Sequence, residues 1–338
     1  MTEPQERTAR PPRRLCVAPM MGLTTRHARY FLRLITRHTW LYTEMVTTEA
    51  LLRANPGHLL RHHPRERPVA LQVGGNEPAA LARCAALGQE QGFDEINLNV
   101  GCPSDRVQSA RFGACLMAQP DVVAAGVRAM LQACDIPVTV KTRIGIDHMD
   151  EYSDLARFVE RVARAGCTTF IVHARKAWLR GLSPRENRDV PPLRYESVYR
   201  LKREFPALEI ILNGGVRSWP EIRAHLHHVD GVMLGRAAYH DPYLLASADR
   251  LCFADARPIP SRGQVIEALM PYVREELARG TRLHHISRHL LGLFQGRAGA
   301  RRWRRYLSRH ACLADADEHV IRAALSQLAN TDGMRAVA

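Results

Sequence analysis

Short, mostly apolar runs recur along the first 245 residues, and each run is typical of a buried β-strand. The predicted strands span eight ranges: 15–19, 41–46, 68–73, 95–100, 137–142, 168–173, 208–213 and 231–234. Between them, apolar residues return every three to four positions, as in amphipathic helices, over 78–91, 121–133, 154–165, 195–204 and 219–227. This alternation predicts an α/β fold, a (β/α)8 TIM barrel over residues 14–245.

The alternation stops at about residue 246. Residues 258–263 have the composition of a linker. Four further helices are predicted, over 264–279, 282–294, 297–309 and 316–329. We therefore expect a smaller all-helical domain over residues 246–338. Residues 1–13, rich in Arg, Pro and Glu, are interpreted as a disordered leader.

A polar or conformationally special group lies at or just after the carboxyl end of each predicted strand. A barrel gathers these ends on one face, where barrel enzymes build their active sites. The groups are Pro19, Met20, Met21, Glu44, Gln72, Asn99, Cys102, Lys141, Arg143, His173, Asn213, Gly214, Gly215, Gly235 and Arg236. The sequence therefore predicts one cavity lined by these groups.

The segment Asn-Leu-Asn-Val-Gly-Cys-Pro joins a strand to a loop and brings Asn97, Asn99 and Cys102 towards the same face. Gly101 permits a tight turn, and Pro103 prevents immediate helix continuation. Free cysteines are commonly buried and structural. From these residues alone, Cys102 is either a catalytic group or a packed thiol.

The seventh and eighth strand ends indicate a phosphate site. Backbone amides at Gly214, Gly215 and Gly235, with the guanidinium of Arg236, suit the phosphate of a cofactor. A double glycine otherwise marks only a tight turn. Lys141 adds a compact cation in a chain with three lysines, although a core-edge residue with an outward head is the alternative.

The formal net charge of +14 favours an anionic partner such as nucleic acid. A general bias towards arginine is the alternative. In the predicted helix 297–309, Arg297, Arg301 and Arg304 share one side and Trp303 lies on another. Such a face is either solvated or suited to a phosphate backbone.

Other classes of protein are disfavoured. There is no apolar run of membrane-spanning length and no export signal, so we expect a cytoplasmic protein. Eight cysteines without a C-x-x-C pair predict reduced thiols. No metal is expected, because His62-His63, His227-His228 and the His285/His289 pair lack a third ligand at suitable spacing.

Several motifs accompany the predicted strand ends. They are Val17-Ala-Pro-Met, Tyr42-Thr-Glu-Met-Val, Leu71-Gln-Val-Gly-Gly, Asn97-Leu-Asn-Val-Gly-Cys-Pro-Ser, Val140-Lys-Thr-Arg-Ile-Gly, Leu182-Ser-Pro-Arg-Glu-Asn-Arg and Met233-Leu-Gly-Arg-Ala. Over residues 14–310 the chain resembles the tRNA-dihydrouridine synthases. The segments His173-Ala-Arg-Lys-Ala-Trp-Leu and Gly299-Ala-Arg-Arg-Trp-Arg-Arg-Tyr-Leu resemble the A subgroup, which acts on D-loop uridines 20 and 20a.

The resemblance implies FMN in the barrel mouth, NADPH as its reductant, and a helical domain that holds tRNA. It implies hydride transfer from reduced flavin to C6 of uracil and proton transfer from Cys102 to C5. The implied FMN residues are Pro19, Met20, Met21, Gln72, Lys141, His173, Asn213, Gly214, Gly215, Gly235 and Arg236. The implied tRNA contacts are Asn99, Arg185, Arg188, Arg301 and Arg304. We expect the enzyme to act as a monomer.

The chain departs from the family pattern after Ala-Pro-Met, where the family often has acidic residues. Gly22 and Thr25 occupy those places here. Two other functions remain open: an FMN-dependent reductase of a free pyrimidine, and a non-catalytic RNA-binding protein with a vestigial barrel. The basic helical region disfavours the first, and the intact set of strand-end groups disfavours the second.

Overall fold

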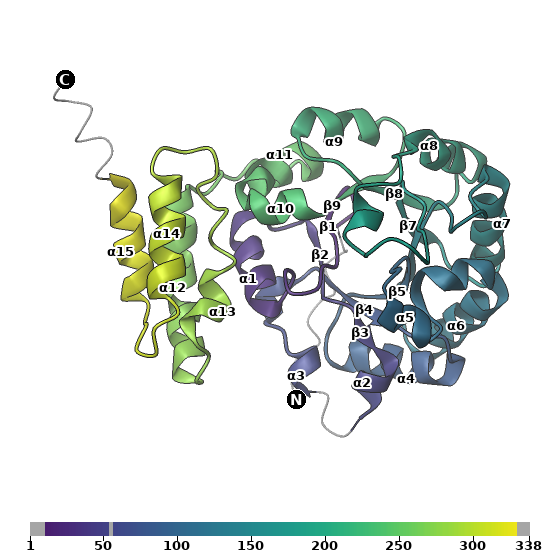
Figure 1. Ribbon diagram of the computed structural model, residues 1–338, viewed down its shortest axis with the longest axis horizontal. Helices are drawn as coiled ribbons and strands as arrows, with labels where there is room; N and C mark the ends of the chain where they lie inside the picture. Colours follow the sequence, from purple (N-terminus) through teal and green to yellow (C-terminus); the bar gives the residue numbers. More distant parts are fainter. Residues whose placement is uncertain (1–10, 54–56, 330–338) are drawn as a thin grey trace.

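The computed structural model describes residues 11–53 and 57–329, and its central feature is a closed parallel barrel (Figure 1). The strands are β1 (Leu15–Val17), β2 (Trp40–Tyr42), β3 (Val46–Thr47), β4 (Val69–Gly74), β5 (Glu95–Val100), β6 (Val138–Arg143), β7 (Thr169–His173), β8 (Glu209–Asn213) and β9 (Gly231–Leu234). Pairing of β1 with β9 and of β2 with β4 closes the ring. The predicted (β/α)8 TIM barrel is confirmed.

The second predicted strand, 41–46, is divided in the structure. Its first part is β2, and its last residue begins the short β3, which pairs with the carboxyl end of β4. The chain leaves the ladder at Thr43, whose hydroxyl accepts a hydrogen bond from the Gln72 amide at 3.0 Å. A side chain thus takes the place of a backbone acceptor, and the strand is interrupted.

Helices surround the barrel, and the five predicted there are found to within two residues at each end. They are α4 (Pro78–Glu90), α6 (Pro120–Ala133), α7 (Tyr152–Ala163), α8 (Tyr195–Glu204) and α9 (Trp219–Leu226). Further helices are α1 (Arg26–Ile35), α2 (Thr48–Leu52), α3 (Gly57–Leu60), α5 (Asp105–Ser109), α10 (Arg236–His240) and α11 (Ala248–Phe253). Short 3-10 turns are η1 (Pro64–Glu66), η2 (Gly113–Ala118), η3 (Glu186–Arg188) and η4 (Pro242–Ser247).

The barrel interior is divided between apolar and polar side chains. One part is a separate apolar cluster that includes Trp40, Ile171, Ile211 and Met233. Along β5 the inward positions are polar instead, because side chains alternate across a strand and every second residue there is Glu or Asn. The larger apolar core lies between strands and outer helices.

The predicted leader, residues 1–13, extends too far. Its first ten residues lie outside the described range, but Arg13 belongs to the barrel. The Arg13 guanidinium pairs with Glu95 at 2.7 Å and with Glu209 at 2.8 Å, and it lies over the Trp40 ring. These carboxylates are far away in sequence, so local composition gives no sign of them.

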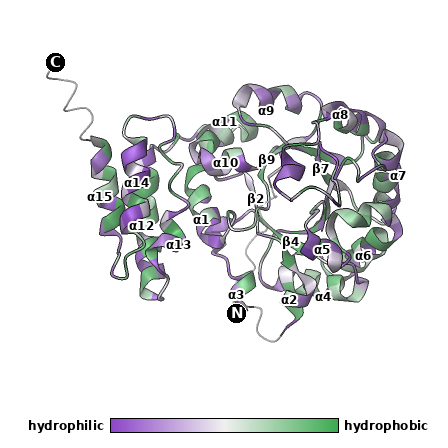
Figure 2. Cartoon of the chain, viewed as in Figure 1, coloured by the Kyte–Doolittle hydropathy of each residue, from purple (hydrophilic) through white to green (hydrophobic). Residues whose placement is uncertain are grey.

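Four helices follow the barrel: α12 (Arg262–Ala278), α13 (Leu283–Ser287), α14 (Ala300–His310) and α15 (His319–Ala329). In Figure 2, α14 is coloured mainly hydrophilic, and its buried residues are Ala300, Trp303 and Leu307. The predicted helix 282–294 is wrong beyond residue 287, where the chain forms turns. The domain boundary at residue 246 stays a prediction.

Glycines explain these turns. A side chain at Gly292 would come within 2.4 Å of the His240 carbonyl oxygen, so this turn abuts the barrel closely. Gly296 and Gly299 have φ angles of +73° and +79°, which favour glycine. The segment 288–299 therefore makes a compact connection instead of a helix.

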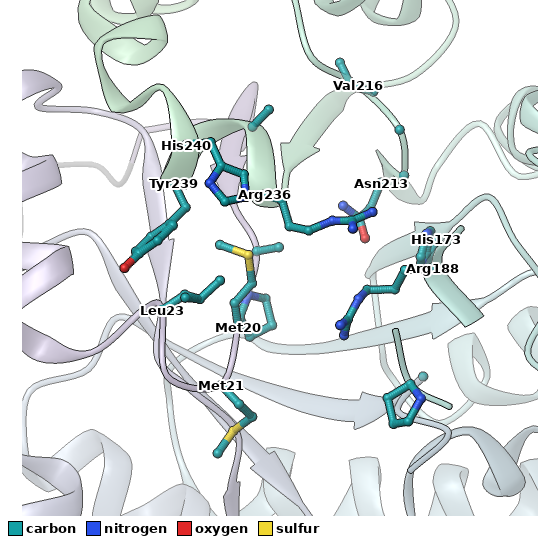
Figure 3. A pocket seen from close by; sticks show the side chains of 18 of the residues that line it. Met20, Met21, Leu23, His173, Arg188, Asn213, Val216, Arg236, Tyr239 and His240 are labelled. Carbon is teal, nitrogen blue, oxygen red and sulfur yellow. The ribbon is translucent and has the colours of Figure 1, made fainter. Parts of the chain in front are cut away.

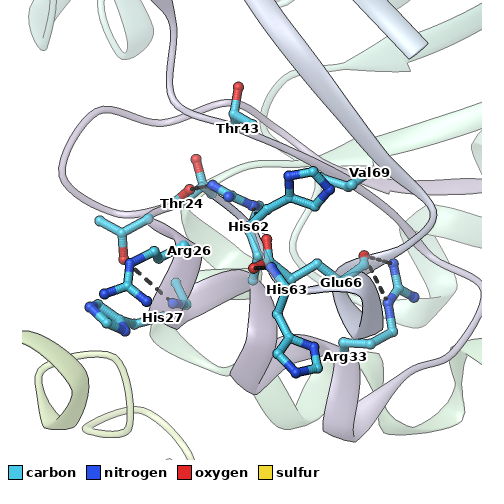
Figure 4. Close-up of polar contacts among 12 residues, drawn as sticks. Thr24, Arg26, His27, Arg33, Thr43, His62, His63, Glu66 and Val69 are labelled. Carbon is cyan, nitrogen blue, oxygen red and sulfur yellow. Dashed lines mark hydrogen bonds and ion pairs between the residues drawn. The ribbon is translucent and has the colours of Figure 1, made fainter. Parts of the chain in front are cut away.

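The C-terminal helices sit beside α1 (Figure 1). Glu276 of α12 is fully buried and pairs with Arg26 of α1, and the Tyr272 ring stacks on Tyr30 with centroids 3.9 Å apart. Figure 4 shows polar contacts that α1 makes within the barrel part of the chain, where Arg33 donates to the backbone oxygen of Glu66 at 3.0 Å. Paired charges and stacked rings thus hold the helical group against the barrel.

Three compositional expectations can be compared with the structure. All eight cysteines are free thiols, as predicted. In the described ranges, no helix has both the length and the apolar character needed to cross a membrane. Within the same ranges, His, Cys, Asp and Glu side chains do not gather in groups of three or more that could hold a metal ion.

Candidate active site

A cavity of about 1300 Å³ lies at the carboxyl ends of the barrel strands. Figure 3 shows His173, Asn213, Arg188 and Arg236 directed into it, with Tyr239 on the opposite side. All the residues expected to bind FMN line it, together with Asn99, Cys102, Arg188 and Arg304. The structure therefore brings together groups that are far apart in the sequence.

Strand register places the polar groups beside one another. Asn99 of β5 lies opposite Lys141 of β6, and His173 of β7 lies opposite Asn213 of β8. Because parallel strands start their loops at the same end of the barrel, these four side chains form one polar layer on the cavity floor.

Lys141 is the cation of this floor. Its Nζ donates to Asn213 Oδ1 at 3.0 Å, and Asn213 Nδ2 donates to the Met233 carbonyl at 2.8 Å. Burial, with the charge of Arg143 beside it, lowers the pKa of Lys141 to about 7. The ammonium has three donors, and the described protein groups accept from one of them. Lys141 is therefore suited to an anionic ligand, which would restore its charge.

His173 presents an uncharged ring to the cavity. Burial, together with Arg143 and Lys141, lowers the pKa of His173 well below its usual value. Neither ring nitrogen bonds to any part of the chain that the structure describes. A side chain at Gly214 would come within 2.7 Å of His173 Cδ2, so glycine leaves room for the ring. The imidazole is thus free to bind a ligand as a neutral group.

The loop after β5 holds Cys102 at the cavity. Asn99 Oδ1 accepts from the Gly101 and Cys102 amides at 3.1 and 3.0 Å. The Cys102 thiol donates to Ser104 Oγ at 3.5 Å. Partly exposed and lining the cavity, Cys102 is not a packed core thiol. Of the two interpretations left open by the sequence, this placement favours the catalytic one.

Arg143 fixes this loop to the loop after β7. Its guanidinium donates to the carbonyl of Gly101 at 2.9 Å and to those of Lys176 and Asn187 at 3.0 Å. One buried fork thus joins the Cys102 loop to the segment that carries η3. The sequence placed Arg143 at a strand end but gave no sign of these partners.

Arginines line the cavity beside its glycine-rich loops. Gly214 and Gly215 have φ angles of +120° and +75°, which suit glycine. Arg236 pairs with Asp189 at 2.6 Å, and this hydrogen bond lowers the pKa of Asp189. Burial and the charge of Arg236 lower the pKa of Arg188. Cations crowded in this way favour an anion between them.

Gly22 and Thr25, where the family often has acidic residues, have defined places here. The Gly22 amide donates to Glu44 Oε1 at 2.6 Å, so the carboxylate that shapes the first loop comes from the next strand end. Thr25 caps α1 by accepting from the Ala28 amide, and it hydrogen-bonds His289 at 2.8 Å. The first loop is thus held without the acidic residues.

The residues expected to contact tRNA fall into two groups. Asn99, Arg188 and Arg304 line the cavity, whereas Arg185 and Arg301 do not. Arg301 lines a neighbouring hollow of about 490 Å³ at the start of α14. Both hollows share Arg304 and its partner Gln295, whose Oε1 accepts from Arg304 at 3.0 Å.

Some cavity residues were missed from the sequence. Tyr239, Arg288 and Gln295 line the cavity from α10 and from the turns after α13. Arg288 and Gln295 follow no predicted strand, and Tyr239 lies three residues beyond Arg236, the last strand-end group that was predicted. The closely spaced glycines after residue 291 were the available signal, since they rule out the continuous helix that was predicted there.

The cavity fits a flavin nucleotide. Lys141 and His173 offer donors that the described residues leave unused, and Gln72 donates one of its two amide hydrogens to Asn97 at 2.7 Å. Glycine amides and Arg236 stand at the charged side. An elongated ligand with a polar ring system at one end and a phosphate at the other matches this distribution.

Comparison with known proteins gives the family. A family model described as dihydrouridine synthase matches residues 16–330. The chain is 60% identical over 311 residues to the tRNA-dihydrouridine(20/20a) synthase of Synechocystis sp., covering 92% of this chain and 93% of the relative. Identity is 56% with the Vibrio cholerae protein of that name, over 93% and 96%, and 55% with that of Escherichia coli K12, over 94% and 92%. This chain belongs to the dihydrouridine synthase family of flavin-dependent oxidoreductases.

Proposed function

We propose that this protein reduces uridine to 5,6-dihydrouridine in the D-loop of tRNA, at positions 20 and 20a, with FMN as cofactor and NADPH as reductant. The names of its relatives support this substrate. The observation that carries the proposal is the partly exposed Cys102 thiol, which lines the same cavity as Lys141 and His173.

The cofactor would occupy the barrel end of the cavity. A bound flavin supplies the hydride that reduces the C5–C6 bond of uracil. Gln72, Lys141 and His173 would hold its ring system, and Lys141 would stabilise negative charge there. The remaining proposed contacts are Pro19, Met20, Met21 and Asn213 at the ring end, and Gly214, Gly215, Gly235 and Arg236 at the phosphate end.

Cys102 would protonate the substrate. Addition of hydride at C6 of uracil leaves negative charge on C5 and the C4 carbonyl, and C5 must then receive a proton. A thiol is protonated at neutral pH yet acidic enough to give up its proton. The backbone of Cys102 is held at Asn99, and Gly101 is tied to Arg143, so the donor is supported from two sides.

Asn99 has less capacity to bind tRNA than the family resemblance implied. Its Oδ1 accepts from two backbone amides, and its Nδ2 donates to Gln72 Oε1 at 2.9 Å. One amide hydrogen remains for a carbonyl of the uracil ring. We therefore assign Asn99 mainly to holding the Cys102 loop.

tRNA would bind across the cavity mouth. Arg185 and Arg188 lie at η3 on the barrel side, and Arg301 and Arg304 lie on α14, within the proposed tRNA-binding domain 246–338. A uridine must leave its stack to reach a barrel mouth, which costs a few kcal/mol. Contacts with phosphates from both sides would offset this cost.

The test is mass mapping of D-loop uridines after incubation of tRNA with the protein, FMN and NADPH. The wild type should add two hydrogens to a D-loop uridine. Cys102→Ala should slow this about 10²- to 10⁴-fold while NADPH still reduces the flavin. Cys115→Ala, which changes a partly exposed thiol outside the cavity, is the matched control and should react normally.

Reduction of free uracil but not of tRNA would instead support a small-pyrimidine reductase. The wall contributed by Gln295 and Arg304 disfavours that alternative. A cavity completed by a basic helix serves a polyanion better than a small neutral base.

A further inference from the structure

Polar side chains form a continuous file inside the barrel, and it begins at the amino end of β5. Glu95 is fully buried: its Oε2 accepts from Arg13 at 2.7 Å, and its Oε1 accepts from Tyr42 at 2.9 Å and from Thr139 at 2.6 Å. Burial lowers the pKa of Arg13, but the carboxylates beside it raise it above its usual value overall, so the guanidinium stays charged. A carboxylate only accepts hydrogen bonds. Thr139 must therefore give its single hydroxyl hydrogen to Glu95.

The donor role of Thr139 determines which atoms of the next side chains donate and which accept. Because the Thr139 hydrogen is used, its oxygen accepts from Asn97 Nδ2 at 2.8 Å. Asn97 Oδ1 then accepts from Gln72 Nε2 at 2.7 Å, and Gln72 Oε1 accepts from Asn99 Nδ2 at 2.9 Å. Each contact leaves the next amide with one favourable orientation. Asn97 and Gln72 are almost completely buried, so water is poorly placed to compensate for a reversed amide.

The file ends at the loop of the proposed proton donor. Asn99 Oδ1 accepts from the Gly101 and Cys102 amides. A reversed Asn99 would turn its NH₂ group towards two N–H donors and leave both without an acceptor. The orientation of Asn99 therefore matters for the position of Cys102.

We propose that Glu95 and Thr139 are positioning residues for the reaction, because they set the direction of a hydrogen-bonded file that orients Gln72 and Asn99 and so holds the Cys102 loop. The inference rests on the proposed role of Cys102. No proton needs to travel along the file. Its effect is to select one arrangement of three amides, which leaves one Gln72 N–H for the cofactor and the Asn99 oxygen for the loop.

The barrel contains an internal comparison. Arg13 also pairs with Glu209, and Glu209 Oε2 accepts from the Thr169 hydroxyl at 2.8 Å. Above this pair the interior is apolar, with Ile171 and Ile211 on the same strands. Like Thr139, Thr169 donates its hydroxyl hydrogen to a carboxylate that pairs with Arg13. Among the described residues, however, no side-chain amide donates to the Thr169 hydroxyl oxygen, so no polar file continues from it.

The experiment compares Thr139→Val, Thr139→Ser and Thr169→Val in the flavin-loaded full chain. Valine keeps the shape of threonine and leaves the Arg13–Glu95 pair in place. In Thr139→Val we expect hydrogen exchange at the Gly101 and Cys102 amides to become severalfold faster, and kcat for tRNA reduction to fall about tenfold without a change in KM. Thr139→Ser should restore both values. Thr169→Val should match the wild type.

Equal effects of Thr139→Val and Thr169→Val would overturn the proposal, since a general loss of barrel packing would then suffice. Failure of Thr139→Ser to restore the values would do the same. If the wild type does not reduce tRNA, the proposed function fails, but the exchange of the loop amides still tests the file.

Discussion

The floor and the rim of the cavity are built in opposite ways. On the floor, Asn213 accepts from Lys141 and donates to a backbone carbonyl, so its position is fixed. On the rim, Arg185 and Arg301 are exposed, and neither forms an ion pair with any residue that the structure describes. Chemistry on one ring requires fixed geometry, whereas binding of a folded polyanion depends chiefly on charge. Variants on the floor should therefore alter cofactor and rate, and variants on the rim should alter affinity and its salt dependence.

The largest effect should be that of Lys141→Met, on the floor, on the affinity for FMN. Loss of a hydrogen bond from a charged group typically costs about 1.5–3 kcal/mol, roughly a ten- to hundredfold rise in the FMN dissociation constant. Flavin fluorescence titration measures it. Lys202→Met is the matched control, because the Lys202 ammonium pairs with Asp230 at 2.8 Å away from the cavity. Equal FMN affinity in both variants would show that the floor needs no cation.

The next effect is a pH dependence of the flavin-free protein. The pKa of Lys141 is lowered to about 7 by burial, with Arg143 contributing, from a usual value of 10.5. Between these values the unfolded chain holds a proton on Lys141 that the folded chain does not. The free energy of unfolding should therefore rise with pH through this window, by at most about 1.4 kcal/mol per pH unit.

Urea unfolding at two pH values inside this window, in the wild type and in Lys141→Met, isolates the contribution. The wild type should gain stability relative to the variant as pH rises. A constant difference between the two proteins would mean that Lys141 keeps its usual proton affinity on the floor.

The smallest effect should come from the rim. Arg301→Ala should weaken tRNA binding severalfold and reduce the slope of log affinity against log salt by about 0.7–0.9. Flavin reduction by NADPH should not change. Arg309→Ala removes an exposed arginine from the other end of α14, outside both hollows, and is the control. If both half-reactions fell together in Arg301→Ala, Arg301 would not act by binding alone.

The barrel and its floor could be predicted because their signals are local. Alternation of apolar runs gives the strands, and the group after each run gives the floor, from Gln72 to Arg236. The predictions that were wrong concern segments whose structure depends on contacts between residues that are distant in the sequence. Arg13 looks like part of a leader until Glu95 and Glu209 are brought to it. The break at Thr43 depends on the neighbouring strand.

The cavity wall from the C-terminal helices was missed for a related reason. The spacing of apolar residues predicted a helix through residue 294. In the structure the helix ends at Ser287 and glycine-containing turns follow it. Tertiary contact decides here, because Gly292 lies directly against the backbone of His240. The tRNA role of Arg185 and Arg301 stays a prediction, since an exposed arginine reveals its partner only when that partner is bound.

The contacts of Arg13 also have a consequence for biosynthesis. Arg13 is translated 196 residues before Glu209, and β1, which follows it, pairs with β9. At a translation rate of about 5–20 residues per second, some 10–40 seconds pass between the synthesis of Arg13 and the synthesis of Glu209. The barrel can therefore close only after most of the chain has left the ribosome. Until then β1 can pair with β2 but lacks β9 on its other side, and this leaves an unpaired strand edge, the kind of surface that chaperones protect.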